Sequence, residues 1–313
     1  MLGYIIRRLL AVVPVMIIVA LFVFLILRLT PGDPAAILAG DSATPAQLER
    51  IRDRLGLNLP LYEQFFQWVR MMFQGDLGVS LISNTPVSTM IGQRIWPTLN
   101  IAMLTIFLSV LIAVPMGVLA AWRHRSWVDY AVMSFSVLGF SVPVFVIGYL
   151  FIQIFAIELR WLPVQGYTAP TQDLLGFFQR ALLPSFTLAT IYVALIARMT
   201  RASMLDVLGE DYVRTARAKG LREGSILFRH ALRNAAVPIM TIIGTGFALL
   251  IAGVVVTESV FNIPGVGRLT VDAILARDYP VIQAMILLTA GLYVLVNLLI
   301  DISYTIIDPR IRY

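Results

Sequence analysis

The sequence predicts an all-α integral membrane protein with about six transmembrane helices, and three observations support this fold class. Hydrophobic residues make up 59% of the 313 residues, and only 13% are charged, whereas soluble domains carry about 25% charged residues. Apolar runs close to the ~20 residues that a helix needs to cross a bilayer recur along the chain, and charged residues bound each run. A larger soluble core would not explain the missing charge, because single cores stop growing with chain length.

Composition also excludes several kinds of site. The formal net charge is +6, and Lys219 is the only lysine among the basic residues. The arginines lie between hydrophobic runs rather than on one contiguous basic face, so no nucleic-acid partner is expected. The chain has no cysteine, which excludes disulfides, thiolate zinc sites and a cysteine nucleophile.

Each predicted span begins and ends at a charged or polar residue. The first is expected to be retained as an anchor helix over residues 1–29, because Leu27–Pro31 lacks the small-residue pattern of a cleavage site. The second opens at Pro97, where proline suits the first helical turn. Gly139 and Pro143 interrupt the third, and the fourth is short. The expected spans lie within residues 8–28, 94–123, 129–158, 180–198, 234–258 and 278–301.

Basic residues in the short loops predict the orientation of these spans. The side that collects most of the arginines, including the dense segment 201–236, is expected to be cytoplasmic, and both termini lie on that side. A miscount of the short fourth span would reverse the C-terminus, but the arginines near the chain end favour the cytoplasm. The other arginines assigned to this side are Arg7, Arg8, Arg123, Arg125, Arg310 and Arg312.

An extracytoplasmic helical segment is expected over residues 30–96, between the anchor helix and the core domain of residues 97–313. Thr44 and Pro45 read as the start of a helix that stops at Gly56. A second helix is expected to start at Pro60 and to end at Gly75. Its apolar residues recur at helical spacing and predict one buried face. Whether this segment is a docking platform or a packing cap stays open. The apolar positions are Tyr62, Phe65, Phe66, Val69, Met72 and Phe73.

The extracytoplasmic loop 257–281 combines helix-breaking residues with a high apolar content. Irregular backbone at membrane depth is tolerated only where protein or a water-filled cavity shelters it. A re-entrant loop that lines the pathway and an ordinary tight turn are both compatible with this pattern. The candidate pathway residues are Phe261, Asn262, Pro264, Gly265 and Gly267.

The segment 201–236 is the most informative part of the chain. Its glycines leave a short helix from about Glu210 to Lys219, too short to be stable alone in water. On this helix Val213, Ala216 and Gly220 share a narrow face of modest bulk, which another surface could approach closely. We therefore predict that the helix docks into a groove of a partner. A solvated loop with a positive-inside bias would explain the arginines but not the small-residue face.

This segment resembles the cytoplasmic loop of ABC importer permeases. The likeness rests on the run Asp211–Leu221 and on the following His230–Ala235, and it extends over nearly the whole chain. The branch it resembles is the dipeptide, oligopeptide and nickel family, which also includes glutathione permeases, in its first-permease type. Arg214 and Thr215 depart from the general glutamate–alanine pattern, as does Arg233 at the position of a late proline. The further matching segments are residues 30–34, 75–78, 264–267, 277–280 and 308–312.

The resemblance implies a type I importer membrane domain that forms half of a translocation pathway. It implies a second homologous permease in a heterodimer, two ATP-binding subunits that hold ATP and magnesium, and an extracytoplasmic solute-binding protein. The chain would be a multi-pass protein of the bacterial inner membrane, with the substrate left open among peptides, glutathione and nickel chelates. The residues expected to couple to the ATPases are Asp211, Tyr212, Val213, Arg214, Thr215, Ala216, Arg217, Ala218, Lys219 and Gly220.

Two competing functions follow from the residues themselves. An enzyme is not expected, because Asp301 and Asn297 in the sixth span have no catalytic partner, and Lys219 precedes a glycine instead of completing a phosphate-binding loop. No cofactor is expected in this chain. A stand-alone secondary transporter is the stronger alternative, although the two halves show no internal repeat and the span centres are nearly free of charge.

Overall fold

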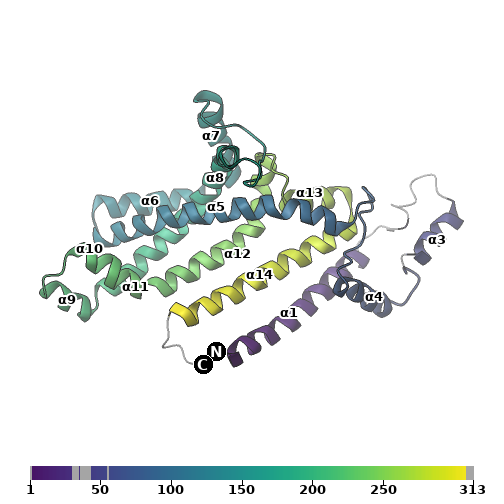
Figure 1. The fold of residues 1–313 in the computed structure, drawn as a ribbon, viewed down its shortest axis with the longest axis horizontal. Helices are drawn as coiled ribbons and strands as arrows, with labels where there is room; N and C mark the ends of the chain where they lie inside the picture. Colours follow the sequence, from purple (N-terminus) through teal and green to yellow (C-terminus); the bar gives the residue numbers. More distant parts are fainter. Residues whose placement is uncertain (1, 30–34, 36–43, 55, 308–313) are drawn as a thin grey trace.

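The computed structural model describes residues 2–29, 35, 44–54 and 56–307, and every named element in these ranges is a helix (Figure 1). The matching segments at residues 30–34 and 308–312 lie outside the described residues, as do Arg310 and Arg312. Within the described ranges the all-helical fold class is confirmed.

Five long helices run side by side (Figure 1). Helix α5 packs most extensively against α8, α12 packs against both of them, and α1 lies at the periphery against α14. Most side chains of α1 that the structure describes are exposed, as expected of a helix that faces lipid. The five helices are α1 (Leu2–Leu29), α5 (Val87–Trp122), α8 (Leu174–Leu208), α12 (Ala236–Val260) and α14 (Tyr279–Ile307).

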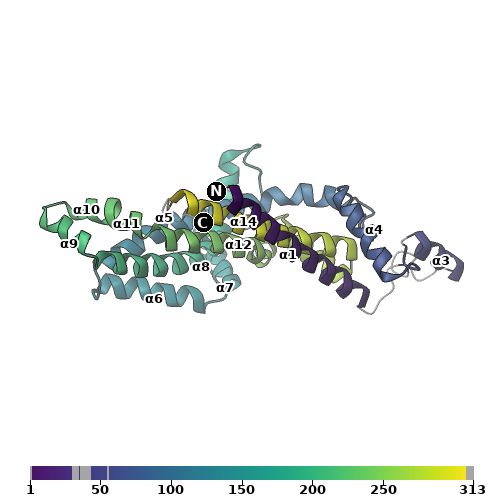
Figure 2. The same cartoon turned by 90° about the horizontal axis from the view of Figure 1, so that it is seen from below.

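Short helices occupy the two ends of this bundle (Figures 1 and 2). At one end, which we call the α9 end, lie α9 (Asp211–Ala218), α10 (Glu223–Ser225), η2 (Ile226–Ala231) and α11 (Leu232–Asn234). At the opposite end, the α4 end, lie α3 (Pro45–Arg54) and α4 (Leu61–Phe73). The start of α1 and the end of α14 both point toward the α9 end (Figure 1).

The third predicted span is broken, as its glycine and proline indicated. Helix α6 (Trp127–Ser141) is followed by α7 (Val144–Phe151) and η1 (Ile152–Glu158), and the chain bends by 103° between the two arms. Proline has no backbone N–H and cannot continue the helical ladder, so Pro143 starts the second arm. A helix between the last two spans, α13 (Val266–Ala276), was not predicted.

Three of the described helices are long and apolar enough to cross a membrane, and each of two bent pairs adds a further candidate. These three are Val87–Trp122, Leu174–Leu208 and Tyr279–Ile302, and the bent pairs are α6 with α7–η1 and α10–α11 with α12. In α1 the apolar stretch Leu10–Leu25 is shorter. Each of the six predicted runs falls on a helix, while the exact number of spans stays a prediction.

Two predictions about the long helices are wrong. Helix α5 begins at Val87, after Pro86, and contains Pro97 in its interior. Its first turns pack with α13 and α14 around Val87 and Ile91, and this tertiary contact extends the helix beyond the point that local sequence indicated. The fourth span is not short, because α8 runs through Arg180 and Arg198 over 35 residues.

The two predicted helices at the α4 end are confirmed as α3 and α4. Thr44 forms the expected N-cap, with its backbone N–H donating to Gln47 Oε1 at 2.9 Å, the reciprocal contact of a capping box. The predicted buried face of α4 is only partly formed. Phe65 packs against Phe24 of α1, whereas Tyr62, Phe66 and Phe73 are exposed.

The close contact of α5 with α8 depends on small residues. A Cβ atom on Gly117 would lie 2.5 Å from Cβ of Thr200 and 2.7 Å from the carbonyl oxygen of Ala197. Such approaches replace the hydrophobic effect as the source of packing energy between helices in lipid. At the periphery, Arg8 of α1 pairs with Asp301 of α14 through contacts of 2.9 and 3.1 Å, so Asp301 joins two helices.

Candidate functional site

Helix α9 is anchored to the chain by one side. The helix has eight residues, too few for stability in isolation, and it packs against η2. Val213 is fully buried, and the Tyr212 hydroxyl accepts a hydrogen bond from Asn234 Nδ2 at 2.8 Å. Gly220 ends the helix with φ of +76°, a left-handed conformation that glycine adopts without strain.

This anchoring corrects one expectation. Val213 was expected to share a free face with Ala216 and Gly220, but its side chain is buried within the chain and is not free. The reason is that so short a helix needs an apolar anchor of its own. Ala216 is half-buried. The remaining predicted coupling residues are exposed, namely Asp211, Tyr212, Arg214, Thr215, Arg217, Ala218, Lys219 and Gly220.

Exposed aromatic residues with basic neighbours mark the surface of this region. Tyr212 is 42% exposed on α9 and Phe228 is 58% exposed on η2. Exposed aromatic side chains surrounded by polar residues are typical of interaction sites. We call this set the α9 surface. Its other members are the exposed basic residues Arg214, Arg217, Lys219, Arg222, Arg229 and Arg233.

A buried ion pair fixes the helices that lead into the α9 surface. Asp129, at the start of α6, is 2% exposed and binds Arg201 of α8 through distances of 2.5 Å to Nε and 2.8 Å to Nη2. The same carboxylate accepts from the backbone N–H of Arg125 at 3.0 Å and contacts His124 Nδ1 at 3.2 Å. The turn between α5 and α6 is thereby joined to the part of α8 that continues toward α9.

A second buried acid organises the loop before α13. Glu258, in the last turn of α12, is 0% exposed. Its carboxyl group accepts from the Thr98 hydroxyl of α5 and from the backbone N–H of Arg268 at 2.8 Å. Thr98 in turn accepts from the backbone N–H of Val266 at 2.9 Å. The N-terminal amides of α13 are therefore satisfied by side chains of two long helices.

Two glycines of the loop are required by this arrangement. A Cβ atom on Gly265 would overlap the carboxyl group of Glu258, and one on Gly267 would lie 2.8 Å from Cα of Val255. Neither position has room for a side chain. The glycines thus allow the loop to approach α12 closely, which is a packing reason for their presence.

A third buried acid joins the loop before α5 to the loop before α14. Asp278 is 4% exposed and Ser80 is 1% exposed. Asp278 accepts from the Ser80 hydroxyl and, at 3.0 Å, from the backbone N–H of Leu81. The segment 277–280 noted in the sequence therefore contains one partner of this buried contact, and the segment 75–78 ends two residues before the other.

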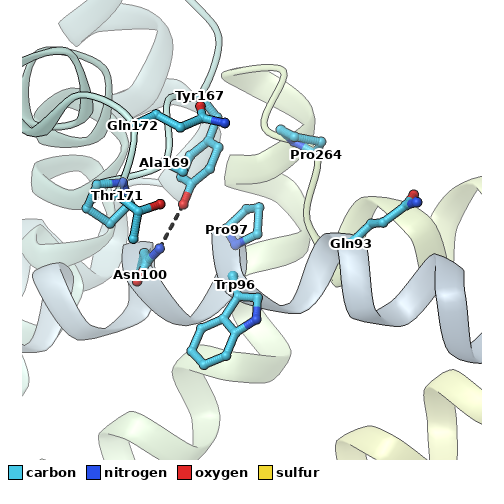
Figure 3. A pocket seen from close by; sticks show the side chains of 10 residues that line it. Gln93, Trp96, Pro97, Asn100, Tyr167, Ala169, Thr171, Gln172 and Pro264 are labelled. Atoms are coloured by element: carbon cyan, nitrogen blue, oxygen red, sulfur yellow. Dashed lines mark hydrogen bonds between the residues drawn. The ribbon is translucent and has the colours of Figure 1, made fainter.

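An open cavity of about 640 Å³ lies beside the amino-terminal half of α5 (Figure 3). One wall is a face of α5 with lining residues at positions 93, 96, 97 and 100, the i, i+3, i+4, i+7 spacing of one helical face. The other wall is the loop before α8, where the Tyr167 hydroxyl accepts from Asn100 Nδ2 at 2.7 Å (Figure 3). Pro264 of the loop before α13 completes the lining.

The predicted pathway residues divide into two groups. Phe261, Gly265 and Gly267 are buried, and Asn262 and Pro264 are exposed. Of the five, Pro264 alone is in the cavity lining that the structure describes. The backbone N–H of Gly166 donates to the carbonyl oxygen of Phe261 at 3.1 Å, which brings the two loops together. This long-range contact has no signal in the sequence.

The polar cavity residues were missed by sequence analysis. Gln93 and Asn100 could have been found as two amides on one face of a helix, but the predicted helix began at Pro97 and separated them. Thr171 and Gln172 lie in an irregular loop, where no periodicity indicates which way a side chain points.

The long apolar helices and the broken span are typical of a multi-pass membrane protein. The model of the binding-protein-dependent transport system inner membrane component matches residues 113–313, and the model of the N-terminal part of such components matches residues 1–102. The chain belongs to this family, and it is a permease component of the peptide ABC importer type.

Relatives of known name agree with this assignment. The chain is 55% identical over 310 residues to the probable peptide ABC transporter permease protein y4tP of Sinorhizobium fredii, covering 99% of each chain. It is 45% identical over 314 residues to the glutathione transport system permease protein GsiC of Escherichia coli K12, covering all of both. A chain of the MetNI methionine ABC transporter in an inward-facing conformation has a TM-score of 0.59 at 16% identity, covering 70% of this chain and 96% of that one. The last likeness shows a shared fold.

Proposed function

We propose that this chain is one of two permeases in an ATP-driven importer for peptides or a related small solute. In this proposal a second homologous permease completes the pathway, two ATP-binding subunits hold ATP and magnesium, and a solute-binding protein delivers the solute. The α9 end faces the cytoplasm of a bacterium, the α4 end faces outward, and the inner membrane surrounds the bundle. The family assignment and the full-length relatives support the importer class and its partnership with ATP-binding and solute-binding subunits, and the basic residues of the α9 end support its cytoplasmic orientation.

The α9 surface is the observation that carries the proposal. It exposes Tyr212 and Phe228 on segments that pack directly on each other. Helix α8 runs into α9, and α11 runs into α12, so movement of this surface is transmitted along two long helices. In the mechanism we propose, closure of the ATPases on ATP moves the α9 surface, and the Asp129–Arg201 pair passes this movement to α6.

Copurification tests the proposal directly. Isolation of the chain from membranes, with and without an ATP analogue, is expected to bring along a second permease and ATPase subunits. Purification of the chain alone, with transport driven by a proton or sodium gradient, would contradict the proposal and favour a secondary transporter.

The Phe228→Asp variant is expected to lose the ATPase subunits while staying in the membrane. The change places a charge at the exposed aromatic position, and loss of an interface anchor weakens binding by roughly 30-fold or more. The measurements are ATPase copurification and the amount of inserted chain. Phe228→Leu keeps the apolar contact and serves as the matched control. Equal ATPase recovery from both variants would contradict a role of Phe228 in docking.

A cysteine at position 264 is expected to report the transport cycle. The chain has no native cysteine, Pro264 is exposed, and its neighbour Ile263 is fully buried. If the loop lines the pathway, labelling of Pro264→Cys by a maleimide in the assembled importer changes when the ATP analogue is added. Ile263→Cys is the control and is expected to resist labelling in both states. Labelling of Pro264→Cys at one rate in both states would count against the pathway assignment.

A further inference from the structure

The cavity beside α5 has a lining without charge. The side chains that can donate and accept hydrogen bonds in it are those of Gln93, Asn100, Tyr167, Thr171 and Gln172, and none of the lining residues that the structure describes is acidic or basic. Amide and hydroxyl groups match the N–H and C=O groups of a peptide bond. The ionised ends of a peptide would lack a charged partner here, and burying an unpaired charge is costly.

We propose that this cavity is a binding subsite for the uncharged amide groups of the transported solute, such as an internal peptide bond. The inference rests on the proposed importer function and adds to it the place and the kind of recognition. At this subsite the permease binds backbone amides in the middle of a peptide and does not contact its charged termini.

The Asn100 side chain has capacity left for a ligand. Its Nδ2 donates one hydrogen bond, to the Tyr167 hydroxyl, at 2.7 Å (Figure 3). Within the described residues the structure gives this amide no other partner. An asparagine amide can donate twice and accept twice, and a tyrosine hydroxyl that accepts can still donate. The pair can therefore bind the carbonyl and the N–H of one peptide group.

The backbone of α5 offers a further acceptor on the same face. Pro97 has no N–H, so the helical hydrogen bond that would reach the carbonyl oxygen of Gln93 cannot form. Gln93 and Pro97 both line the cavity. Proline in a membrane helix frees a carbonyl group that another polar group can use, and a solute N–H is such a group.

The apolar part of the lining is rigid. Pro97, Pro170 and Pro264 contribute rings with fixed backbone φ, and Trp96 is 65% exposed beside them. Rigid apolar walls with a few placed polar groups are typical of pockets for small molecules. Apolar contact would hold the solute without selecting one side chain, while the amides fix its backbone.

Uptake by the complete importer, reconstituted with its partner subunits in proteoliposomes, tests the subsite. The probes are tri-alanine, glutathione, and tri-alanine methylated on the backbone nitrogen of its central residue. The variants are Asn100→Leu in α5 and Gln172→Leu in the loop, so that one remains informative if the other fails to assemble. Gln179→Leu, an exposed glutamine of α8 outside the cavity, is the matched control. Affinity of the solute-binding protein for each probe is measured separately.

Loss of one neutral hydrogen bond corresponds to an increase in KM of about three- to tenfold. We expect this increase for tri-alanine with Asn100→Leu and Gln172→Leu, and no change with Gln179→Leu. N-methylation of the probe is expected to raise KM in the native importer and to have little further effect in Asn100→Leu, because both changes remove the same contact. This non-additivity distinguishes a direct contact from a general structural effect.

Two results would overturn the inference, and they differ in what else they affect. If native importer transports a probe while both cavity variants match the control, or if methylation costs the same in all of them, the subsite is wrong and the importer function stands. If the assembled native complex shows no ATP-driven uptake of any solute that its solute-binding protein binds, the proposed function fails, and the inference fails with it.

Discussion

The Asp129→Ala variant is expected to lose most of its folded population in detergent. In this variant the charged guanidinium of Arg201 loses its carboxylate partner in a site where only 21% of the Arg201 side chain is exposed. Removal of one partner of a buried ion pair costs about 3–5 kcal/mol. Asp129 also accepts from the backbone N–H of Arg125, and that donor would lose its acceptor. The measurement is the thermal unfolding midpoint of the purified protein.

The same pair provides its own control. The double variant Asp129→Leu/Arg201→Leu removes both charges and is expected to recover much of the stability, because apolar replacement of a buried pair is often neutral. Glu223→Ala breaks the more exposed pair with Arg217 and is expected to cost less than about 1 kcal/mol. An unfolding midpoint of Asp129→Ala equal to that of Glu223→Ala would contradict the role given to Asp129.

If the double variant folds but does not couple, the ion pair has a second role. Asp129 joins α6 to α8, and α8 continues to α9. In that case the two leucines restore stability but do not transmit movement between α8 and α6. ATPase activity that no longer responds to the solute-binding protein would be the sign of this separation.

Sequence was sufficient where short-range chemistry determines an element. Thr44 capped α3, and Gly220 ended α9 where the glycines of this segment predicted the end of a short helix. Pro143 divided the third span as its chemistry requires. Each of these features depends on contacts within a few residues, so the pattern along the chain contains the information.

Sequence analysis was wrong where tertiary contacts determine where a helix begins or which face it exposes. Pro86 and Pro97 both suit the start of a helix, and only the packing of Val87 and Ile91 against α13 and α14 selects the first of them. Val213 looked like part of a free face because nothing along the chain shows that α9 packs against η2. The predicted start at Pro97 also separated the two amides of the cavity.

The charged residues that marked the predicted span ends are the clearest case. Asp129, Glu258 and Asp278 were read as the polar limits of apolar runs, yet each is buried and hydrogen-bonded. Hydropathy shows that a charged residue ends an apolar run, but it does not show whether that residue is exposed to water or buried against a neighbouring helix. Buried polar groups of this kind need hydrogen-bond partners. These three residues therefore hold loops in place as well as marking the ends of apolar runs.

The loop before α13 offers a test of such a buried contact. Gly265→Ala is expected to destabilise the protein by about 1–3 kcal/mol, because the added methyl group overlaps the Glu258 carboxyl group. Glu258→Ala is expected to cost about 1–3 kcal/mol for each donor left unpaired, namely the Thr98 hydroxyl and the Arg268 amide. Both costs are read from thermal unfolding, and Gly92→Ala, where nothing lies within 4 Å, is the steric control.

The double variant Gly265→Ala/Glu258→Ala decides whether the overlap is the cause. Truncation of Glu258 removes the atoms that the new methyl group would meet. The double variant is therefore expected to lose at least about 1 kcal/mol less stability than the sum of the two single losses. Gly92→Ala/Glu258→Ala is expected to be additive. Additivity in both pairs would mean that Gly265 is not needed for its close approach to Glu258. In that case the loop would be held by the helix-terminal hydrogen bonds alone, and labelling at position 264 would change with Glu258→Ala but not with Gly265→Ala.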